Sequence, residues 1–220
     1  MSVTITGLYC GQRGTTLPDG TASGMRKGAV PHATVGPLGL IGDYQADRLV
    51  HGGADKAVHH YPAAHYAHLA AAFPAAAHAL VAGSLGENLS SSGIDEHGVH
   101  IGDVYACGAV RLQLTQPRRP CWKIDQHHEL RGLAALIARA GRTGWYYRVL
   151  TGGRISAGMP CELIDRDAAA PSIAELHATL AAARPPLDTL ARYATLAALP
   201  AALRRRIATR LAWLRRHPAP

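Results

Sequence analysis

One cysteine stands among cations in the stretch LQLTQPRRPCWKID, residues 112–125. Three basic residues lie within three positions of Cys121: Arg118, Arg119 and Lys123. Neighbouring cations stabilise the thiolate form of a thiol, and a thiolate is both a nucleophile and a ligand for soft metals. Prolines on both sides of the arginine pair favour a stiff, extended path that fixes where the thiol points. We therefore favour a functional Cys121 over a buried structural one.

A second stretch, GLIGDYQADRLVHGGADKAVHHYP (residues 39–62), interleaves glycines with acidic, basic and histidine side chains. Glycine lets the backbone approach a ligand closely, so such a loop can offer amides to an anion, with Lys56 adding charge. A hairpin with satisfied polar residues accounts for the composition equally well. A zinc site at His51, His59 and His60 is disfavoured, because no matching carboxylate or cysteine spacing supports it.

A third stretch, GSLGENLSSSGI (residues 83–94), is rich in glycine and serine and precedes an expected strand. Here the carboxylate of Glu87 and the amide of Asn88 could hold the turn together or bind a ligand. Taken alone, this stretch favours the structural interpretation.

The elements that must position these residues are short strands over most of the chain. Strands are expected at residues 2–9, 109–116, 145–150 and 160–166, where apolar residues alternate or run continuously between turn residues. Because no repeated strand-helix alternation is visible, the pattern favours a mixed α/β, mainly β barrel over a doubly wound sheet. Two helices are expected between the strands, at 62–80 with a break near Pro74 and at 129–140.

The last quarter of the chain changes to alanine-rich, helical patterns. Ser172 and Glu175 form a capping box, and Pro200 suits the first position of a later helix. Apolar residues of that later helix recur at helical spacing: Leu203, Ile207, Leu211 and Leu214. The sequence therefore predicts a β-barrel domain over residues 1–168 and a three-helix domain over residues 169–220.

Composition fits a folded protein, with 220 residues of which 48% are hydrophobic and 17% charged. There is no run of about 18 uncharged apolar residues and no secretory leader pattern, so we expect a cytoplasmic location and no membrane association. The four cysteines have no two-residue spacing, which disfavours a zinc ribbon or a redox dithiol: Cys10, Cys107, Cys121 and Cys161. In a reducing compartment all four should be free thiols.

Positive charge is concentrated in the C-terminal part of the chain, which has a net charge of +8 overall. From Asp165 onward, nine arginines stand against four acidic residues. Such a run could bind nucleic acid, but it is more often the solvated face of an amphipathic helix. The low aromatic content also argues against a base-stacking surface, so nucleic-acid binding is the less favoured interpretation.

These stretches, in this order, resemble the MOSC domain, the module named for the C-terminal part of molybdenum-cofactor sulfurase. The resemblance runs through GLIGDYQADRLVHGGADKAVHHYP, GENLSSSGI, IGDVYACG, LQLTQPRRPCWKI and GRTGWYYRVLTGGRISAG. It is closest to the bacterial YiiM-type members, in which the barrel is followed by three C-terminal helices, and it covers essentially the whole chain. A β-barrel-like fold is what this resemblance implies.

The resemblance also implies a cofactor and a reaction. The MOSC fold binds molybdenum cofactor (molybdopterin), a pterin with a dithiolene group and a phosphate, and the cysteine matching Cys121 coordinates molybdenum or, in sulfurase relatives, carries sulfur. YiiM-type members are associated with resistance to N-hydroxylated base analogues such as hydroxylaminopurine, hence with reduction of small N-hydroxylated substrates. Because nothing in the sequence resembles a flavin, haem or iron–sulfur site, a separate electron-donating reductase is implied.

The chemistry of the residues and the resemblance to the MOSC domain predict the same site. Cys121 is the predicted metal ligand and catalytic residue, and His60, like His51, is a candidate for hydrogen bonding or proton delivery. The predicted cofactor-binding residues are Lys27, His51, Lys56, Asn88, Arg118 and Lys123. A non-catalytic carrier of cofactor or sulfur is the alternative function, and a homodimer is compatible with the sequence.

Overall fold

The computed structural model describes residues 2–11, 13–47 and 51–218. Its strands are β1 (Ser2–Gly11), β2 (Lys27–Ala29), β3 (His32–Gly36), β4 (Gly39–Leu40), β5 (Val58–Pro62), β6 (Leu89–Ser91), β7 (Val104–Cys107), β8 (Val110–Pro117), β9 (Trp145–Thr151), β10 (Gly153–Ser156) and β11 (Pro160–Asp165). Its helices are α2 (His65–Ala72), α3 (Lys123–His128), α4 (Leu133–Ala140), α5 (Ile173–Ala181), α6 (Leu187–Thr195) and α7 (Ala201–Arg216), with short 3₁₀ turns η1 (Ala54–Lys56) and η2 (Pro74–Ala79). These bounds confirm the four expected strands.

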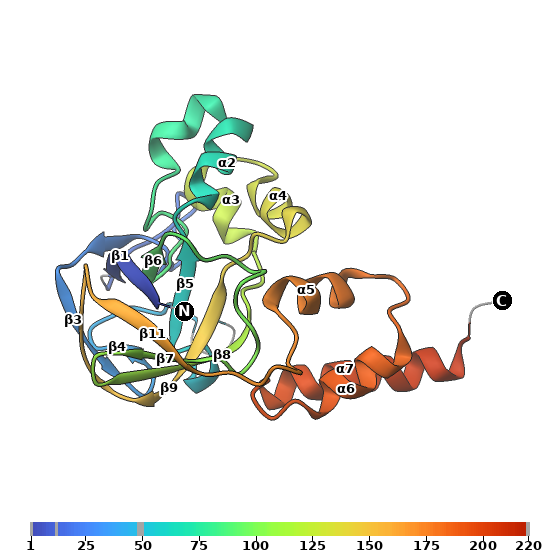
Figure 1. Ribbon diagram of the computed structural model, residues 1–220. Helices are drawn as coiled ribbons and strands as arrows, with labels where there is room; N and C mark the ends of the chain where they lie inside the picture. The colour runs from blue at the N-terminus through green and yellow to red at the C-terminus, as the bar shows by residue number, and fades with distance from the viewer. Residues whose placement is uncertain (1, 12, 48–50, 219–220) are drawn as a thin grey trace.

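Seven strands of the described ranges close into a barrel. They are hydrogen-bonded in the order β11–β7–β8–β9–β5–β6–β1, and the first residues of β1 pair again with β11. Neighbours are antiparallel except β5 and β6, which run parallel. A small sheet of β10, β3 and β4 lies beside the barrel (Figure 1). The expected mainly β barrel is therefore confirmed.

Alternation along the strands fills the barrel with apolar side chains. In β1, Val3 and Ile5 are buried while their immediate neighbours are exposed. In β8, Val110, Leu112 and Leu114 follow the same period of two. Because inward-facing side chains of a barrel this small fill its interior, the barrel is a packed core and the ligand-facing residues lie at its ends and in its loops.

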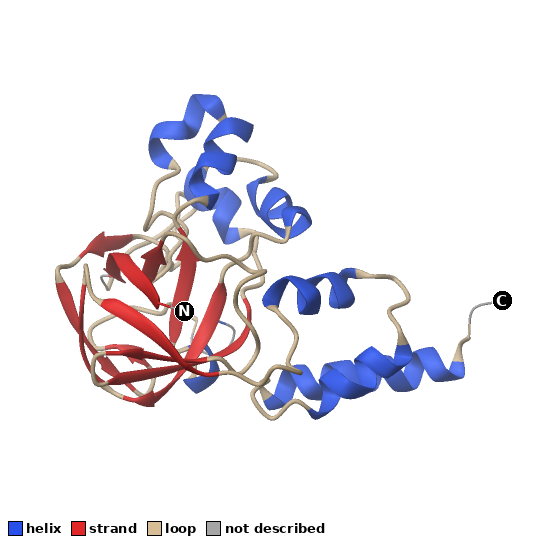
Figure 2. Cartoon of the chain, in the orientation of Figure 1, coloured by secondary structure: helices blue, strands red, loops and turns tan. Residues whose placement is uncertain are grey.

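Two helical segments interrupt the barrel strands, as expected, and Figure 2 shows them gathered on one side of it. The predicted break near Pro74 is confirmed, because α2 ends there and the 3₁₀ turn η2 begins. The expected helix at 129–140 begins later than predicted, at Leu133 (α4). The sequence did not predict the separate helix α3, which ends at His128 because Glu129 adopts a left-handed conformation with φ of 53°. Asp125 then accepts hydrogen bonds from the N–H groups of Gly132 (2.8 Å) and Ala134 (2.7 Å), which fixes the start of α4.

The three C-terminal helices pack against the barrel along one continuous apolar core. The predicted capping box is present, with Glu175 N–H donating to Ser172 Oγ at 3.1 Å and Ser172 N–H donating to Glu175 Oε2 at 2.7 Å. Pro200 lies one residue before α7 rather than in its first turn. Ile207, with Leu211 and Leu214, is buried in the same cluster as the barrel residues. In Figure 1, α7 begins beside the barrel and runs away from it toward the C-terminus.

The expectation of four free thiols is wrong for one pair. Cys107 and Cys161 form a disulfide between β7 and β11, with a Cα–Cα distance of 4.3 Å. The register of these antiparallel strands pairs Glu162 with Ala106, so the two cysteines face each other directly. Cys10 and Cys121 are free, and both are half-buried. None of the helices in the described ranges combines the length and the apolar content that crossing a bilayer requires.

Candidate functional site

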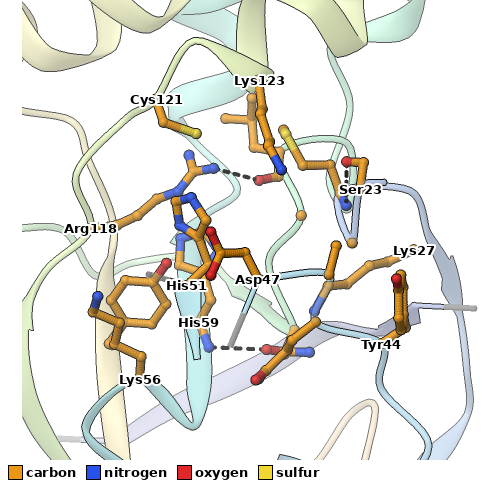
Figure 3. Close-up of a pocket in the computed structure, with 18 residues that line it drawn as sticks. Ser23, Lys27, Tyr44, Asp47, His51, Lys56, His59, Arg118, Cys121 and Lys123 are labelled. Carbon is orange, nitrogen blue, oxygen red and sulfur yellow. Dashed lines mark hydrogen bonds between the residues drawn. The ribbon is translucent and has the colours of Figure 1, made fainter. Parts of the chain in front are cut away.

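A pocket opens where the end of β8, the start of α3 and the loops before β5 and β6 meet (Figure 3). Cys121 lines this pocket. Six further residues that the sequence suggested line it as well: Lys27, His51, Lys56, Asn88, Arg118 and Lys123. The structure thus gathers segments from five regions of the chain around one thiol.

Cys121 lies in the loop between β8 and α3, and its side chain is half-buried. Its carbonyl oxygen accepts the Ile124 N–H at 3.0 Å, and the fully buried Ile124 anchors the first turn of α3. In Figure 3 the sulfur lies above the guanidinium of Arg118. The thiol is therefore fixed at the pocket wall, with room for a ligand atom to reach it.

Arg118 carries a positive charge that is nearly removed from solvent, with 7% of the residue exposed. Its Nη2 donates to the carbonyl oxygen of Leu85 at 3.2 Å, while Nη1 is buried without a hydrogen-bond partner. Leaving a buried donor unpaired costs about 1–3 kcal/mol, and more for a charged group. An anionic ligand in the pocket would remove this cost.

The turn that holds Leu85 is organised by Glu87, whose side chain is fully buried. Its carboxylate accepts from the Gly83 N–H (2.6 Å), the Leu85 N–H (3.2 Å) and the Tyr66 hydroxyl (2.6 Å). Burial raises the pKa of Glu87, and the hydrogen bond from Tyr66 opposes that shift. Glu87 thus shapes the wall on which Arg118 rests, as the structural interpretation of this stretch predicted.

Asn88 and Lys27 meet at Asp43, a residue that the sequence did not single out. Lys27 Nζ lies 2.7 Å from Asp43 Oδ2, and both side chains are almost completely buried. Asn88 Nδ2 donates to the same oxygen at 3.0 Å, and Gly11 N–H donates to Oδ1 at 2.6 Å. Asp43 therefore offsets the charge of Lys27 and fixes Asn88 at the pocket floor.

His51 and Lys56 line the opposite side of the pocket and are half-buried. Burial lowers the pKa of His51, and the nearby positive charges of Arg118 and Lys56 lower it further. Burial and the charge of Arg119 lower the pKa of Lys56. The turn η1 that carries Lys56 is held by Asp55, whose carboxylate accepts from Arg148 Nε at 2.8 Å. The histidine therefore stays uncharged at neutral pH, in a pocket whose charged lining includes Asp47 as well as the cations.

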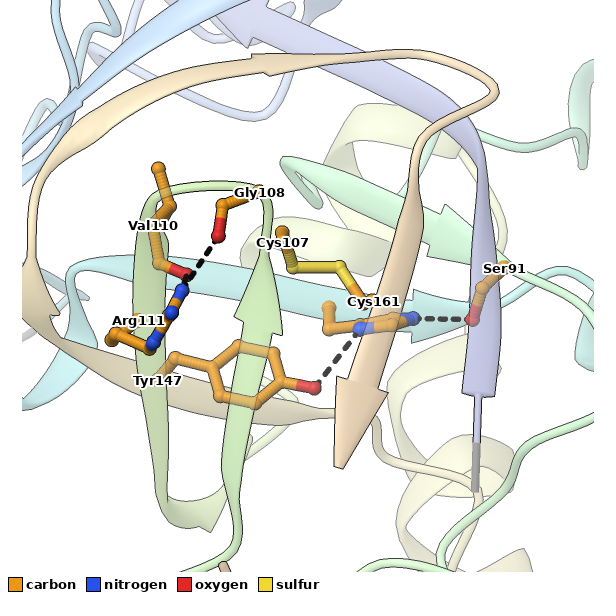
Figure 4. Close-up of a disulfide and its surroundings, with 8 residues drawn as sticks. Ser91, Cys107, Gly108, Val110, Arg111, Tyr147 and Cys161 are labelled. Atoms are coloured by element: carbon orange, nitrogen blue, oxygen red, sulfur yellow. Dashed lines mark hydrogen bonds between the residues drawn. A yellow bond between two sulfur atoms is a disulfide. The ribbon is translucent and has the colours of Figure 1, made fainter. Parts of the chain in front are cut away.

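His59 and His60 are neighbours on β5, and their side chains point in opposite directions. His59 lines the pocket, and its backbone N–H donates to Asn88 Oδ1 at 3.1 Å. His60 instead faces the barrel interior, where Nε2 lies 2.7 Å from Ser91 Oγ and Nδ1 lies 3.3 Å from the Tyr147 hydroxyl oxygen. Figure 4 shows Ser91 and Tyr147 on either side of the Cys107–Cys161 disulfide region. The structure does not bring the predicted His60 to the pocket. The period-two pattern of β5 was a signal that only one of these histidines could face it.

Burial keeps both strand histidines uncharged. The pKa of His60 is lowered to about 3 by burial. Burial lowers the pKa of His59 as well, with a further contribution from the charge of Arg118. The described ranges contain no group of three or more histidine, cysteine, aspartate or glutamate side chains placed to hold a metal ion. His60 points away from the pocket that His51 and His59 line, so these three side chains are not gathered at one place.

The family follows from both sequence and fold. The MOSC domain model matches residues 47–162, which include β5 to β9, Cys121 and most of the pocket. This chain belongs to the MOSC domain family. Within that family it is similar to protein YiiM of Escherichia coli (strain K12), with 44% identity over 129 residues.

The alignments cover different shares of the relatives' lengths. The alignment covers 59% of this chain and 58% of the E. coli protein. A protein named Reductase from Gibberella moniliformis is 36% identical over 129 residues, which cover 58% of this chain and 23% of that protein. The aligned part of the chain thus spans little more than half of the first relative and less than a quarter of the fungal one.

Solved structures extend the similarity through the C-terminal helices. The crystal structure of YiiM from E. coli has a TM-score of 0.80 and 30% identity, covering 97% of this chain and 94% of that chain. The crystal structure of YiiM from Geobacillus stearothermophilus has a TM-score of 0.81 and 30% identity, covering 95% and 99%. Barrel and three-helix region therefore occur together in these relatives.

Proposed function

We propose that this chain binds molybdenum cofactor in the Cys121 pocket and reduces small N-hydroxylated compounds, such as hydroxylaminopurine, with electrons from a separate reductase. Membership of the MOSC family and a relative named Reductase support an oxidoreductase. The observation that carries the proposal is the buried, unpartnered Nη1 of Arg118 beside the accessible thiol of Cys121. A cation and a soft ligand in one pocket suit an anionic, metal-bearing cofactor.

The pocket residues fit such a group by their chemistry. Cys121 would hold the metal, because thiolates prefer soft metals. Arg118, Lys123 and Lys56 would face the phosphate. When bound, the cofactor would supply the two-electron redox chemistry that the side chains lack.

The chain's own part in the reaction is to orient the substrate and supply protons. Reduction of N–OH to N–H consumes two electrons and two protons and releases water. His51 lines the pocket, and its lowered pKa means that it releases a proton readily once protonated. His51 is therefore the proposed proton-delivery group, and Lys56 beside it keeps that part of the pocket positive.

A carrier of cofactor or sulfur is the second candidate. The half-buried Cys121 thiol, free of any disulfide, could hold a transferable sulfur atom. A carrier would pass its cargo to an apo-enzyme and would not reduce hydroxylaminopurine with any electron donor. A persulfide on Cys121 in the purified protein would favour this second function.

Elemental and pterin analysis of freshly purified protein tests the proposal. We expect molybdenum and pterin in wild-type protein from a cofactor-competent host, and loss of both in Cys121→Ser. Cys10→Ser is the matched control, because Cys10 is also free and half-buried but does not line the pocket. If wild-type protein contains neither molybdenum nor pterin, and Cys121→Ser still protects cells from hydroxylaminopurine, the proposal is wrong.

A further inference from the structure

Positive charge continues from the pocket wall onto α7. Arg119 directly follows the pocket residue Arg118, and its side chain is exposed. Arg206 lies near the start of α7, where its side chain is exposed as well. No acidic residue follows Asp188 in the sequence. We call Arg119 and Arg206, together with the adjacent Arg205, the arginine patch.

The packing of α7 fixes which way these arginines point. Ile207 and Leu211 are buried in the core, which sets the rotation of the helix about its axis. Arg210 is bound to the end of α5, where it donates to the carbonyl oxygens of Leu180 (2.7 Å) and Ala182. Arg205 and Arg206 are thus exposed outside the core, in the N-terminal half of α7. This half of the helix starts beside the barrel (Figure 1).

The patch begins at the pocket wall, because Arg119 directly follows the pocket residue Arg118 and α7 starts beside the barrel (Figure 1). Partial burial lowers the pKa of Arg206, and the charges of Arg119 and Arg210 lower it further. The charge of Arg119 also lowers the pKa of Lys56, which lines the pocket. Arg119 therefore lies within electrostatic reach of both the pocket and α7.

The ion pairs of the described ranges leave the arginine patch out. Within the ranges that the structure describes, the ion pairs join Lys27–Asp43, His65–Glu96, Arg148–Asp55 and Arg166–Asp103. None of these includes a member of the arginine patch. Clustered like charges repel each other, and an acidic surface placed against them would relieve that repulsion and guide its own approach.

We propose that the arginine patch docks the acidic surface of a protein electron donor, so that the donor meets the chain beside the mouth of the pocket. This inference rests on the proposed function, because it takes electrons to be delivered by a separate protein. The position of the patch favours a donor, since electron transfer requires close approach to the pocket and Arg119 adjoins a pocket residue.

Binding of the full chain to flavodoxin, an acidic flavoprotein electron carrier, tests the inference. The Kd should rise with salt, and it should rise at least about tenfold in the double variant Arg119→Glu/Arg206→Glu. The matched control is Arg215→Glu/Arg216→Glu, which changes the same charge at the far, exposed end of α7 and should alter the Kd by less than about twofold. Arg119→Gln/Arg206→Gln should give a smaller loss, and thermal melts confirm that each variant is folded.

Three results would overturn the inference. These are no flavodoxin binding at low salt, equal losses in the two charge-reversed variants, or tighter binding of a 20-base-pair duplex DNA through Arg119 and Arg206. The measurement needs neither cofactor nor turnover. Absence of molybdenum and pterin from wild-type protein would thus defeat the proposed function separately, whatever the binding result.

Discussion

The guanidinium of Arg118 and the carbonyl oxygen of Leu85 are joined by a hydrogen bond of 3.2 Å. This bond ties the loop that carries Cys121 to the turn at residues 83–88. That turn is in turn held by the three hydrogen bonds to the Glu87 carboxylate. The shape of the pocket therefore depends on a carboxylate that does not line it.

Glu87→Gln should destabilise the protein and loosen the pocket. A glutamine amide would place a donor where the carboxylate accepts the Leu85 or Gly83 N–H, leaving a buried donor unpaired at a cost of about 1–3 kcal/mol. Urea unfolding measures this loss of unfolding free energy. Glu162→Gln on the exposed side of β11 is the control and should change it by less than about 0.5 kcal/mol. An unchanged unfolding free energy for Glu87→Gln would contradict the role of this carboxylate.

Acid should destabilise the fold through His60. Its pKa in the folded chain is about 3, below the ordinary value of 6.5. Between these values the unfolded chain binds a proton that the folded chain does not, so stability is lost as pH falls from about 6.5 toward 3. One such histidine gives a slope of up to about 1.4 kcal/mol per pH unit.

The variant His60→Gln isolates this contribution. It should make the fall in unfolding free energy between pH 6.5 and 4.5 shallower than in wild-type protein. His97→Gln, at an exposed position, is the control and should retain the wild-type slope. Parallel slopes for wild type and His60→Gln would show that acid acts elsewhere.

The disulfide predicts a specific thiol count. Denatured, unreduced protein should show two reactive thiols, Cys10 and Cys121, and reduction should raise the count to four. The double variant Cys107→Ala/Cys161→Ala should lose about 2–4 kcal/mol of unfolding free energy, because the bond restricts the unfolded chain. Four reactive thiols in unreduced, freshly purified protein would contradict the pairing.

Local patterns in the sequence predicted the elements, and contacts across the fold explain what was missed. The strand at 145–150 and the break near Pro74 are set by neighbouring residues, so they could be read directly. The disulfide depends on the register of β7 against β11, which no spacing along the chain encodes. Asp43 was missed for the same reason, since Lys27 and Asn88 reach it only in the folded barrel.

The sequence could have shown that only one of His59 and His60 faces the pocket, but not which one. Both lie in β5, where successive side chains face opposite sides, so only one could share a surface with Lys56 and Cys121. Which one did so depended on the closure of the barrel. Cys121 was singled out because cations are adjacent to it in sequence, and two of them, Arg118 and Lys123, line the same pocket.

Arg118→Lys separates ligand binding from stability. A lysine keeps the charge but cannot both donate to the Leu85 carbonyl and present a second donor to the pocket, because it lacks the planar fork of arginine. We expect the molybdenum-to-protein ratio to fall about tenfold, which corresponds to about 1.4 kcal/mol of binding. Arg119→Lys makes the same change at the exposed neighbouring position and should leave the ratio unchanged. A parallel loss in both variants would show that general positive charge, rather than the buried Nη1 of Arg118, holds the cofactor.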